Sequence, residues 1–216
     1  MIWGIYPIVD SGVKSGFSEE EFTRRILAAR PPQIQLRIKN LTDLEFFRRA
    51  RLVRKITKES GVILIINDRI DLALALKAEG VHLGQDDLPL EAARELCPAD
   101  MMVGISVRSA AEAESAERGG ASYVAFGPVF PTASKTGAVV VPGGLAELKR
   151  VVGSVSVPVV AIGGIGADNL REVIAAGAAG ASMISALAAA RDVTETVKNF
   201  QMMFAENQNV KKRGQK

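Results

Sequence analysis

The chain has 216 residues, a single cysteine, a net charge of +3 and a hydrophobic fraction of 48%. The one cysteine, Cys97, excludes an internal disulfide framework and is typical of a protein from a reducing cytoplasm. The last seven residues carry four basic side chains, which leaves the rest of the chain close to neutral. Because no pattern of aromatic stacking residues accompanies that charge, nucleic acid is not an expected partner.

The apolar stretches are short and interrupted by charged, glycine or proline residues, so no membrane-spanning helix is expected. The first ten residues lack the basic start of a signal peptide and predict a strand instead. A cytoplasmic globular protein is the resulting expectation.

Strand-like and helical patterns alternate along the whole chain. Strands are expected at residues 2–9, 33–37, 62–67, 80–83, 102–106, 123–126, 157–162 and 181–184. Helices are expected at residues 18–30, 43–60, 70–78, 90–96, 110–118, 144–152, 169–176 and 192–206.

This alternation predicts a parallel sheet, and eight such units predict a (β/α)8 TIM barrel that forms one domain over residues 1–206. A doubly wound open sheet is the alternative, but no GxGxxG turn follows the first strand. Residues 207–216 form a basic tail that is expected to be disordered.

Two neighbouring strands of this barrel run out into acidic residues. Asp68 follows the third strand, and Asp87 follows the fourth. Parallel strands bring their C-terminal ends to one edge, so the two carboxylates can lie side by side. They would then share a cation, and Mg2+ prefers such oxygen ligands together with substrate phosphates. A helix cap and a turn are the alternative roles for these aspartates.

The second strand ends in two cationic side chains. Arg37 and Lys39 alternate along the extended chain and therefore point the same way, with Gln35 below them. A guanidinium and an ammonium directed into one cleft suit a polyanion such as a diphosphate. Alternatively, Lys39 extends into solvent beyond the strand end.

Three further loops at the same edge are candidate parts of the site. The long loop at 127–143, with Thr132, Ser134 and Lys135, favours a functional lid. Gly164 follows the seventh strand, and Ile184-Ser185 precedes a short helical pattern, at the two positions where barrels commonly bind phosphate. A turn that needs glycine only for its shape is the other reading of Gly164.

His82 is the only histidine and lies within a short apolar strand, so it is interpreted as a hydrogen-bonded core residue. No Ser or Cys motif pairs with it as a triad would require, and one His with one Cys makes zinc an unsuitable metal.

Six segments, in order, resemble the thiamine phosphate synthase family: QLRIK, INDRIDLALA, EGVHLGQDD, GPVFPTASK, PVVAIGGI and SMISAL. The resemblance implies a transferase that joins 4-amino-2-methyl-5-hydroxymethylpyrimidine diphosphate to thiazole phosphate, or to its carboxylate, and releases diphosphate. In this family the C–O bond breaks first, and the thiazole nitrogen captures the resulting pyrimidine-methyl cation.

The resemblance also implies roles for individual residues. The pyrimidine diphosphate would be held by Gln35, Arg37, Lys39, Asn67, Ser106 and Lys135. Asp68 and Asp87 would hold Mg2+, and the thiazole phosphate would contact Thr132, Ser134, Gly164, Ile184 and Ser185. Of these, Arg37, Lys39, Ser106 and Lys135 are the candidate catalytic residues. Small-molecule substrates are thus the implied partners, and assembly into a homo-oligomer stays open.

The chain departs from the family pattern at three places: Arg108 replaces a usual His, Ser134 replaces a commoner Thr, and no acidic residue follows Lys135 in the loop. Thiazole tautomerases, which share this barrel, resemble the synthase but use the His at the position of Arg108. A tautomerase-like isomerase and a non-catalytic barrel that binds a phosphorylated metabolite are therefore the competing functions.

Overall fold

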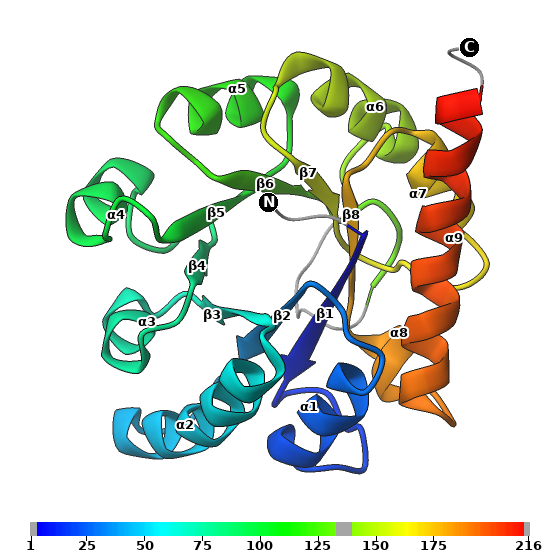
Figure 1. Ribbon diagram of the computed structural model, residues 1–216. Coiled ribbons are helices and arrows are strands. Elements are labelled where there is room, and N and C mark those ends of the chain that lie inside the picture. Colours follow the sequence, from blue (N-terminus) through cyan, green and yellow to red (C-terminus); the bar gives the residue numbers. More distant parts are fainter. Residues whose placement is uncertain (1–3, 133–139, 214–216) are drawn as a thin grey trace.

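The strands pair in sequence order, each parallel to the next, and the first also pairs with the last. This arrangement is seen in a computed structural model that describes residues 4–132 and 140–213, with side chains described up to Glu206. The helices surround the ring of strands (Figure 1). The predicted single-domain (β/α)8 barrel is therefore confirmed.

The elements have the following bounds. The strands are β1 (Gly4–Asp10), β2 (Gln33–Arg37), β3 (Ile63–Asn67), β4 (Gly80–Leu83), β5 (Met102–Val107), β6 (Tyr123–Phe126), β7 (Val159–Ala161) and β8 (Gly180–Met183). The helices are α1 (Glu19–Leu27), α2 (Asp43–Ser60), α3 (Ile70–Leu76), α4 (Leu90–Leu96), α5 (Ala110–Arg118), α6 (Gly144–Ser154), α7 (Leu170–Ala175), α8 (Ser185–Ala188) and α9 (Val193–Arg213).

Local sequence signals account for the ends of several helices. Ser18 caps α1, because its hydroxyl accepts a hydrogen bond from the backbone N–H of Glu21 at 3.2 Å. Thr42 caps α2 in the same way. Helix α2 ends at Gly61, whose φ of 66° is the left-handed conformation that glycine adopts readily.

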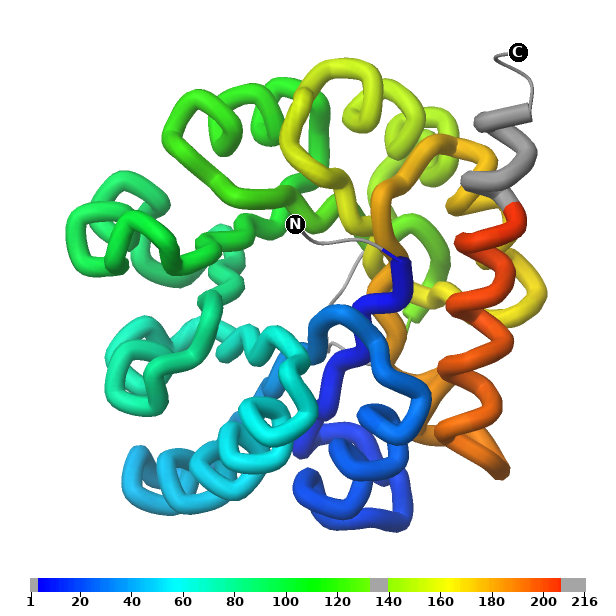
Figure 2. Tube along the Cα trace, in the orientation of Figure 1, coloured from blue at the N-terminus to red at the C-terminus, as the bar shows by residue number. Residues whose placement is uncertain are grey.

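Closure of the barrel joins segments from the two ends of the chain. Gly4 and Ile5 of β1 face Gly180 and Ala181 of β8. Figure 2 shows the blue first strand beside the orange last strand. A side chain at Gly180 would lie 2.9 Å from the Gly4 carbonyl oxygen, so this seam requires a residue without a side chain.

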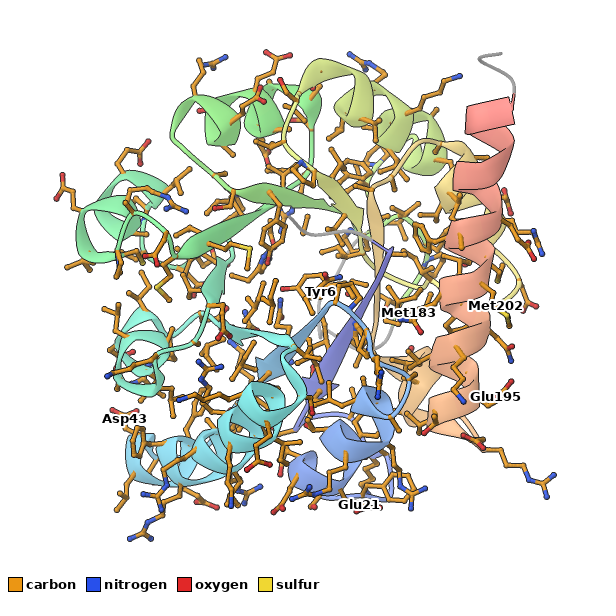
Figure 3. The ribbon with its side chains drawn as sticks, viewed as in Figure 1. Tyr6, Glu21, Asp43, Met183, Glu195 and Met202 are labelled. Atoms are coloured by element: carbon orange, nitrogen blue, oxygen red, sulfur yellow. The ribbon has the colours of Figure 1, made fainter. Side chains whose placement is uncertain are left out.

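The two faces of the strands pack into separate clusters. Outward side chains such as Leu36, Leu64 and Val81 join the helices in one large apolar core. Inward side chains form a small cluster around Tyr6 and Tyr123. Figure 3 shows Tyr6 inside the ring of strands. The alternation along each strand thus separates a purely apolar outer core from an interior that also holds polar groups.

Several element boundaries differ from the sequence-based prediction, and two of these differences concern α9 and β7. Helix α9 continues to Arg213 instead of ending near Glu206 and includes residues 207–213, which had been assigned to the disordered tail; Gly214 is the first helix-breaking residue after that point. Strand β7 begins two residues late because the Val157 backbone N–H donates to Glu117. In the described part of the chain, no helix has the length and apolar character needed to cross a membrane.

Candidate active site

A cavity of about 650 Å³ lies at the C-terminal ends of the strands. It is lined by residues from the strands and from the loops that follow them, as expected for a barrel of this class. Of the thirteen site residues predicted from the sequence, those that line it are Gln35, Arg37, Lys39, Asn67, Asp68, Asp87, Ser106, Thr132, Gly164, Ile184 and Ser185. The other two, Ser134 and Lys135, lie outside the described residues.

Arg37 is fixed by a buried carboxylate. Its Nη1 lies 2.6 Å from Oδ2 of Asp10, whose side chain is fully buried. The other oxygen of Asp10 accepts the backbone N–H of Gly12 at 2.8 Å. This ion pair holds one edge of the guanidinium while the group still lines the cavity.

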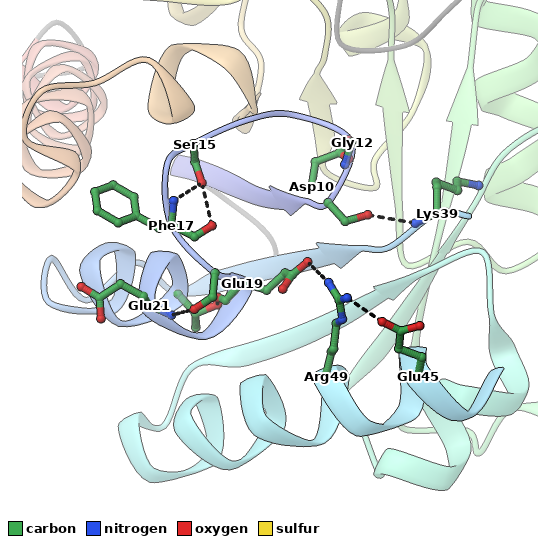
Figure 4. Close-up of polar contacts among 12 residues, drawn as sticks. Asp10, Gly12, Ser15, Phe17, Glu19, Glu21, Lys39, Glu45 and Arg49 are labelled. Carbon is green, nitrogen blue, oxygen red and sulfur yellow. Dashed lines mark hydrogen bonds and ion pairs between the residues drawn. The ribbon is translucent and has the colours of Figure 1, made fainter. Parts of the chain in front are cut away.

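The backbone around Lys39 is tied to the loop that follows β1. The Lys39 N–H donates to the Ser11 hydroxyl at 3.1 Å (Figure 4). In the same view, Arg49 of α2 donates to Glu19 of α1 and to Glu45, which holds the two helices together below that loop. Arg37 at the end of β2 and Lys39 just after it are thus anchored by β1 and its loop.

The first acidic residue, Asp68, is bound from two sides. Its Oδ2 forms an ion pair with the ammonium of Lys39, and its Oδ1 accepts a hydrogen bond from the Asn67 amide. The same amide group donates to the His82 carbonyl at 3.3 Å. Asp68 adopts a φ of 63°, a left-handed conformation in which aspartate is tolerated better than most residues.

The second acidic residue, Asp87, lies next to Asp68. Its Oδ2 accepts the backbone N–H of Gly84 at 2.6 Å. Burial raises the pKa of the Asp87 carboxyl, and the Asp68 carboxylate raises it further, whereas the Gly84 N–H and Lys39 lower it. The two carboxylates therefore share one electrostatic environment, with the ammonium of Lys39 as its nearest cation.

This acid pair fits a magnesium ion better than a metal held entirely by protein. Across residues 4–132 and 140–206, no group of three or more His, Cys, Asp or Glu side chains could hold a metal. Two carboxylates with the remaining positions left to water and phosphate oxygens are the usual protein share of a Mg2+ site.

The opposite side of the cavity is built from tight turns. Gly163 and Gly164 have φ values of 91° and 65°, and a methyl group at Gly164 would overlap the carbonyl oxygen of Pro131. The loop after β6 packs here, with the Phe130 N–H donating to the Gly163 carbonyl at 3.2 Å. The shape of the turn thus requires glycine at position 164, and this residue also lines the cavity. The predicted short helix after Ile184 is α8.

Arg108, the position of the main departure from the family pattern, also lines the cavity. The residue is exposed, and its backbone N–H donates to Glu112 at 2.8 Å. No carboxylate from the described residues forms an ion pair with its guanidinium, in contrast to Arg37. The departure therefore adds a positive charge to the rim of the site.

Sequence reasoning missed two contributors to the site. His82 is buried, as predicted, but it also lines the cavity, and its ring nitrogens bond the Tyr123 and Ser106 hydroxyls. Asp10 lies at the same edge, at the end of β1, and is the ion-pair partner of Arg37. The inward position of His82 could have been inferred from its neighbours, because Val81 and Leu83 both face the outer core.

The fold and the cavity define a class: a (β/α)8 barrel with a cavity at the C-terminal ends of its strands, lined by cationic and acidic side chains. The family model described as thiamine monophosphate synthase matches residues 5–187, and the chain belongs to this family. The family predicted from the six motifs is confirmed, and with it the expected thiamine-phosphate synthase type of transferase.

Relatives agree over nearly the whole chain. The thiamine-phosphate synthase of Methanocella arvoryzae is 43% identical over 206 residues, covering 95% of this chain and 97% of that protein. The thiamine-phosphate synthase of Pyrococcus furiosus is 41% identical, covering 94% and 95%. Among solved structures, the thiamine phosphate pyrophosphorylase of Pyrococcus furiosus superposes with a TM-score of 0.85 at 38% identity, covering 95% and 96% of the two chains.

Proposed function

We propose that this cavity joins 4-amino-2-methyl-5-hydroxymethylpyrimidine diphosphate to thiazole phosphate, or to its carboxylate, and releases diphosphate. The observation that carries the proposal is the convergence of the cationic pair, the acid pair and the glycine turn on one cavity. Full-length similarity to thiamine-phosphate synthases supports the same chemistry.

The pyrimidine diphosphate would bind on the side of β2 to β5. Gln35, Asn67 and Ser106 would contact the pyrimidine, and Arg37 and Lys39 would contact the diphosphate, together with Lys135 outside the described residues. Breaking the C–O bond first leaves negative charge on the departing diphosphate. Fixed positive groups stabilise that charge and so lower the barrier without a general base.

Asp68 and Asp87 would hold Mg2+, which supplies further neutralisation of the diphosphate charge when it is bound. The ammonium of Lys39 now lies against Asp68. In the substrate complex it would be shared between this carboxylate and the diphosphate, so that the cation and the leaving group stay together.

The thiazole phosphate would bind on the opposite side, at Thr132, Gly164, Ile184 and Ser185, with Ser134 outside the described residues. Holding its phosphate there would direct the ring nitrogen toward the methylene carbon of the pyrimidine. After the electrons of the C–O bond have left with the diphosphate, the nitrogen lone pair forms the new C–N bond with the pyrimidine-methyl cation.

The test is a coupled assay on the purified chain with pyrimidine diphosphate, thiazole phosphate and Mg2+, which follows both thiamine phosphate and diphosphate. We expect product that is abolished by EDTA and that falls at least ~100-fold in Asp68→Ala, the scale of a lost electrostatic contact to the leaving group. Asp100→Asn is the matched control, because Asp100 is exposed and precedes β5 at the other end of the barrel.

Isomerisation of the thiazole phosphate carboxylate without coupling would assign the chain to the tautomerase-like alternative. Binding of thiazole phosphate with no turnover would leave only a phosphometabolite-binding barrel. The cytoplasmic location and assembly into a homo-oligomer stay predictions, to be checked by cell fractionation and by light scattering.

A further inference from the structure

Five polar side chains form one unbroken line of hydrogen bonds at the floor of the cavity. The Gln35 amide donates from Nε2 to the Tyr6 hydroxyl at 2.9 Å, and the Tyr6 and Tyr123 hydroxyls lie 2.8 Å apart. The Tyr123 hydroxyl is 3.0 Å from Nδ1 of His82. Nε2 of His82 is 2.9 Å from Oγ of Ser106. The line therefore crosses the barrel interior from β2 to β5.

Every member of the line except Ser106 is buried. Tyr6 and Tyr123 are at most 1% exposed. Gly104 makes room for the second of these rings, because a methyl group at this position would overlap it. Burial raises the pKa of both hydroxyls, so each tyrosine stays neutral and has one proton to donate.

With the Gln35 amide oriented in this way, counting these protons gives the direction of every other link. The Tyr6 oxygen accepts from the Gln35 amide, and within residues 4–132 and 140–206 the only acceptor in reach of the Tyr6 proton is the Tyr123 oxygen. The Tyr123 proton then goes to Nδ1 of His82. A neutral imidazole that accepts at Nδ1 carries its proton at Nε2, and it donates that proton to Ser106. The Ser106 proton is left to point into the cavity.

The same count shows that the two ends are coupled. If the Gln35 amide turned over, its oxygen would accept from Tyr6, and each later link would have to reverse. Ser106 would then donate to His82 and offer only an acceptor to the cavity. One end therefore presents an acceptor whenever the other presents a donor, and both roles change together.

We propose that the two tyrosines and His82 act as positioning residues, which couple the hydrogen-bonding roles of Gln35 and Ser106 and so select an aminopyrimidine over its methoxy analogue. The substrate identity in this inference rests on the proposed function. An exocyclic amino group donates to the Gln35 oxygen while a ring nitrogen accepts from Ser106.

A methoxy group at the same place fails for a definite reason, because its oxygen can only accept a hydrogen bond while the ring nitrogen keeps its lone pair. Gln35 must therefore turn over to meet this oxygen. The coupling then makes Ser106 an acceptor opposite the lone pair of the ring nitrogen. Whichever way the line runs, either Gln35 or Ser106 loses its contact with the substrate. A buried polar group without a partner weakens binding by ~10-fold to ~100-fold.

The first test reads the tautomer directly. His82 is the only histidine in the chain, so nitrogen-15 NMR of the untagged protein gives one unambiguous pair of ring signals. We expect the proton on Nε2 at neutral pH. A proton on Nδ1, or a doubly protonated ring, would overturn the proposal.

Two variants that each remove one oxygen test the coupling. In Tyr123→Phe, Nδ1 of His82 loses its partner, so we expect a mixture of tautomers. In Tyr6→Phe, the only acceptor for the Tyr123 proton is still Nδ1, so the Nε2 tautomer should persist. The reverse pattern, or the same tautomer in both variants, would show that the line does not set the direction.

The second test compares kcat/KM for the amino and methoxy pyrimidine diphosphates. We expect the preference for the amino compound to fall by ~10-fold or more in Tyr123→Phe, because Gln35 can then turn over while Ser106 remains a donor. Ile65→Val is the control, since Ile65 is buried in the same inner cluster but lies off the line. An unchanged preference in Tyr123→Phe would refute the selective role. If the chain made no thiamine phosphate at all, the proposed function would fail, while the tautomer measurement would still decide the coupling.

Discussion

The two faces of the barrel strands have different tasks, although their residues alternate along the same short segments. In β2, Ile34 and Leu36 face the helices within the large apolar core. Gln35, between them, faces the cavity and is nearly as buried, at 3% exposed. Burial alone therefore does not distinguish the stabilising residues of this protein from the functional ones; the direction of the side chain does.

Leu36→Ala should give the largest change in stability. Removing a fully buried aliphatic side chain from the outer core should lower the free energy of unfolding by about 2–5 kcal/mol. The rate per folded molecule should stay close to that of the parent chain. Urea unfolding combined with active-site titration measures both quantities.

Gln35→Ala, one residue away, is the counterpart of that variant. It should lower the rate strongly and the unfolding free energy less than Leu36→Ala does. If the two variants gave the same ratio of stability loss to rate loss, the separation of the two faces would be wrong.

Gly104→Ala should give the next largest loss of stability, because the added methyl group overpacks the barrel interior. The new methyl group overlaps the Tyr123 ring, so the ring must move and its hydrogen bonds are disturbed. We expect a loss of about 1–3 kcal/mol in unfolding free energy. The His82 ring signals in NMR should change with it. An unchanged tautomer in a folded variant would contradict the fit of the ring against this glycine.

Alkaline pH should lower the free energy of unfolding through groups in the barrel interior, and not through the outer core. The chain has two tyrosines, and both lie in the buried line. Above about pH 10 the unfolded chain loses their protons while the folded chain keeps them. The folded state then binds more protons, so stability falls as pH rises, by about 1.4 kcal/mol per pH unit for each tyrosine.

Ultraviolet absorbance of tyrosinate, recorded beside the unfolding curve, checks this expectation. The signal should appear together with unfolding, and Tyr6→Phe should flatten the pH dependence by the share of one tyrosine. Tyrosinate in the folded chain near pH 10 would contradict it.

Glu20→Gln should have the smallest effect. Glu20 pairs with Arg24 at 2.9 Å on the outer surface of α1, where both side chains are well exposed. Such helix pairs contribute about 0.3–0.5 kcal/mol, and salt screens them. Thermal unfolding at low and high salt should show a difference that disappears at high salt.

The sequence was sufficient wherever a signal is local. Strand β2 and helix α2 were predicted with the bounds that the structure has, because Pro31-Pro32 precede the strand and Gly61 ends the helix. Asp68 and Asp87 could be placed together because strand topology decides which ends meet. The extension of α9 to Arg213 was not predicted, because the basic composition of residues 207–213 was given more weight than the absence of a helix breaker.

Contacts between distant side chains were beyond such reasoning. The partner of Arg37 is Asp10, 27 positions earlier, and no spacing rule connects them. The same holds for the hydroxyl contact of Tyr6 and Tyr123, which are 117 positions apart. These pairs depend on which inward residues lie at the same height in the closed barrel.

The seam between β1 and β8 has a consequence for how the chain is made. The partner of the first strand lies near residue 180, so it emerges from the ribosome only when most of the protein has been synthesised. Until then one edge of β1 has no strand beside it, and an unpaired edge can add strands from other chains. A nascent chain that stops before residue 180 should therefore be prone to aggregation and should recruit chaperones. Once β8 has been made and pairs with β1, this open edge no longer exists.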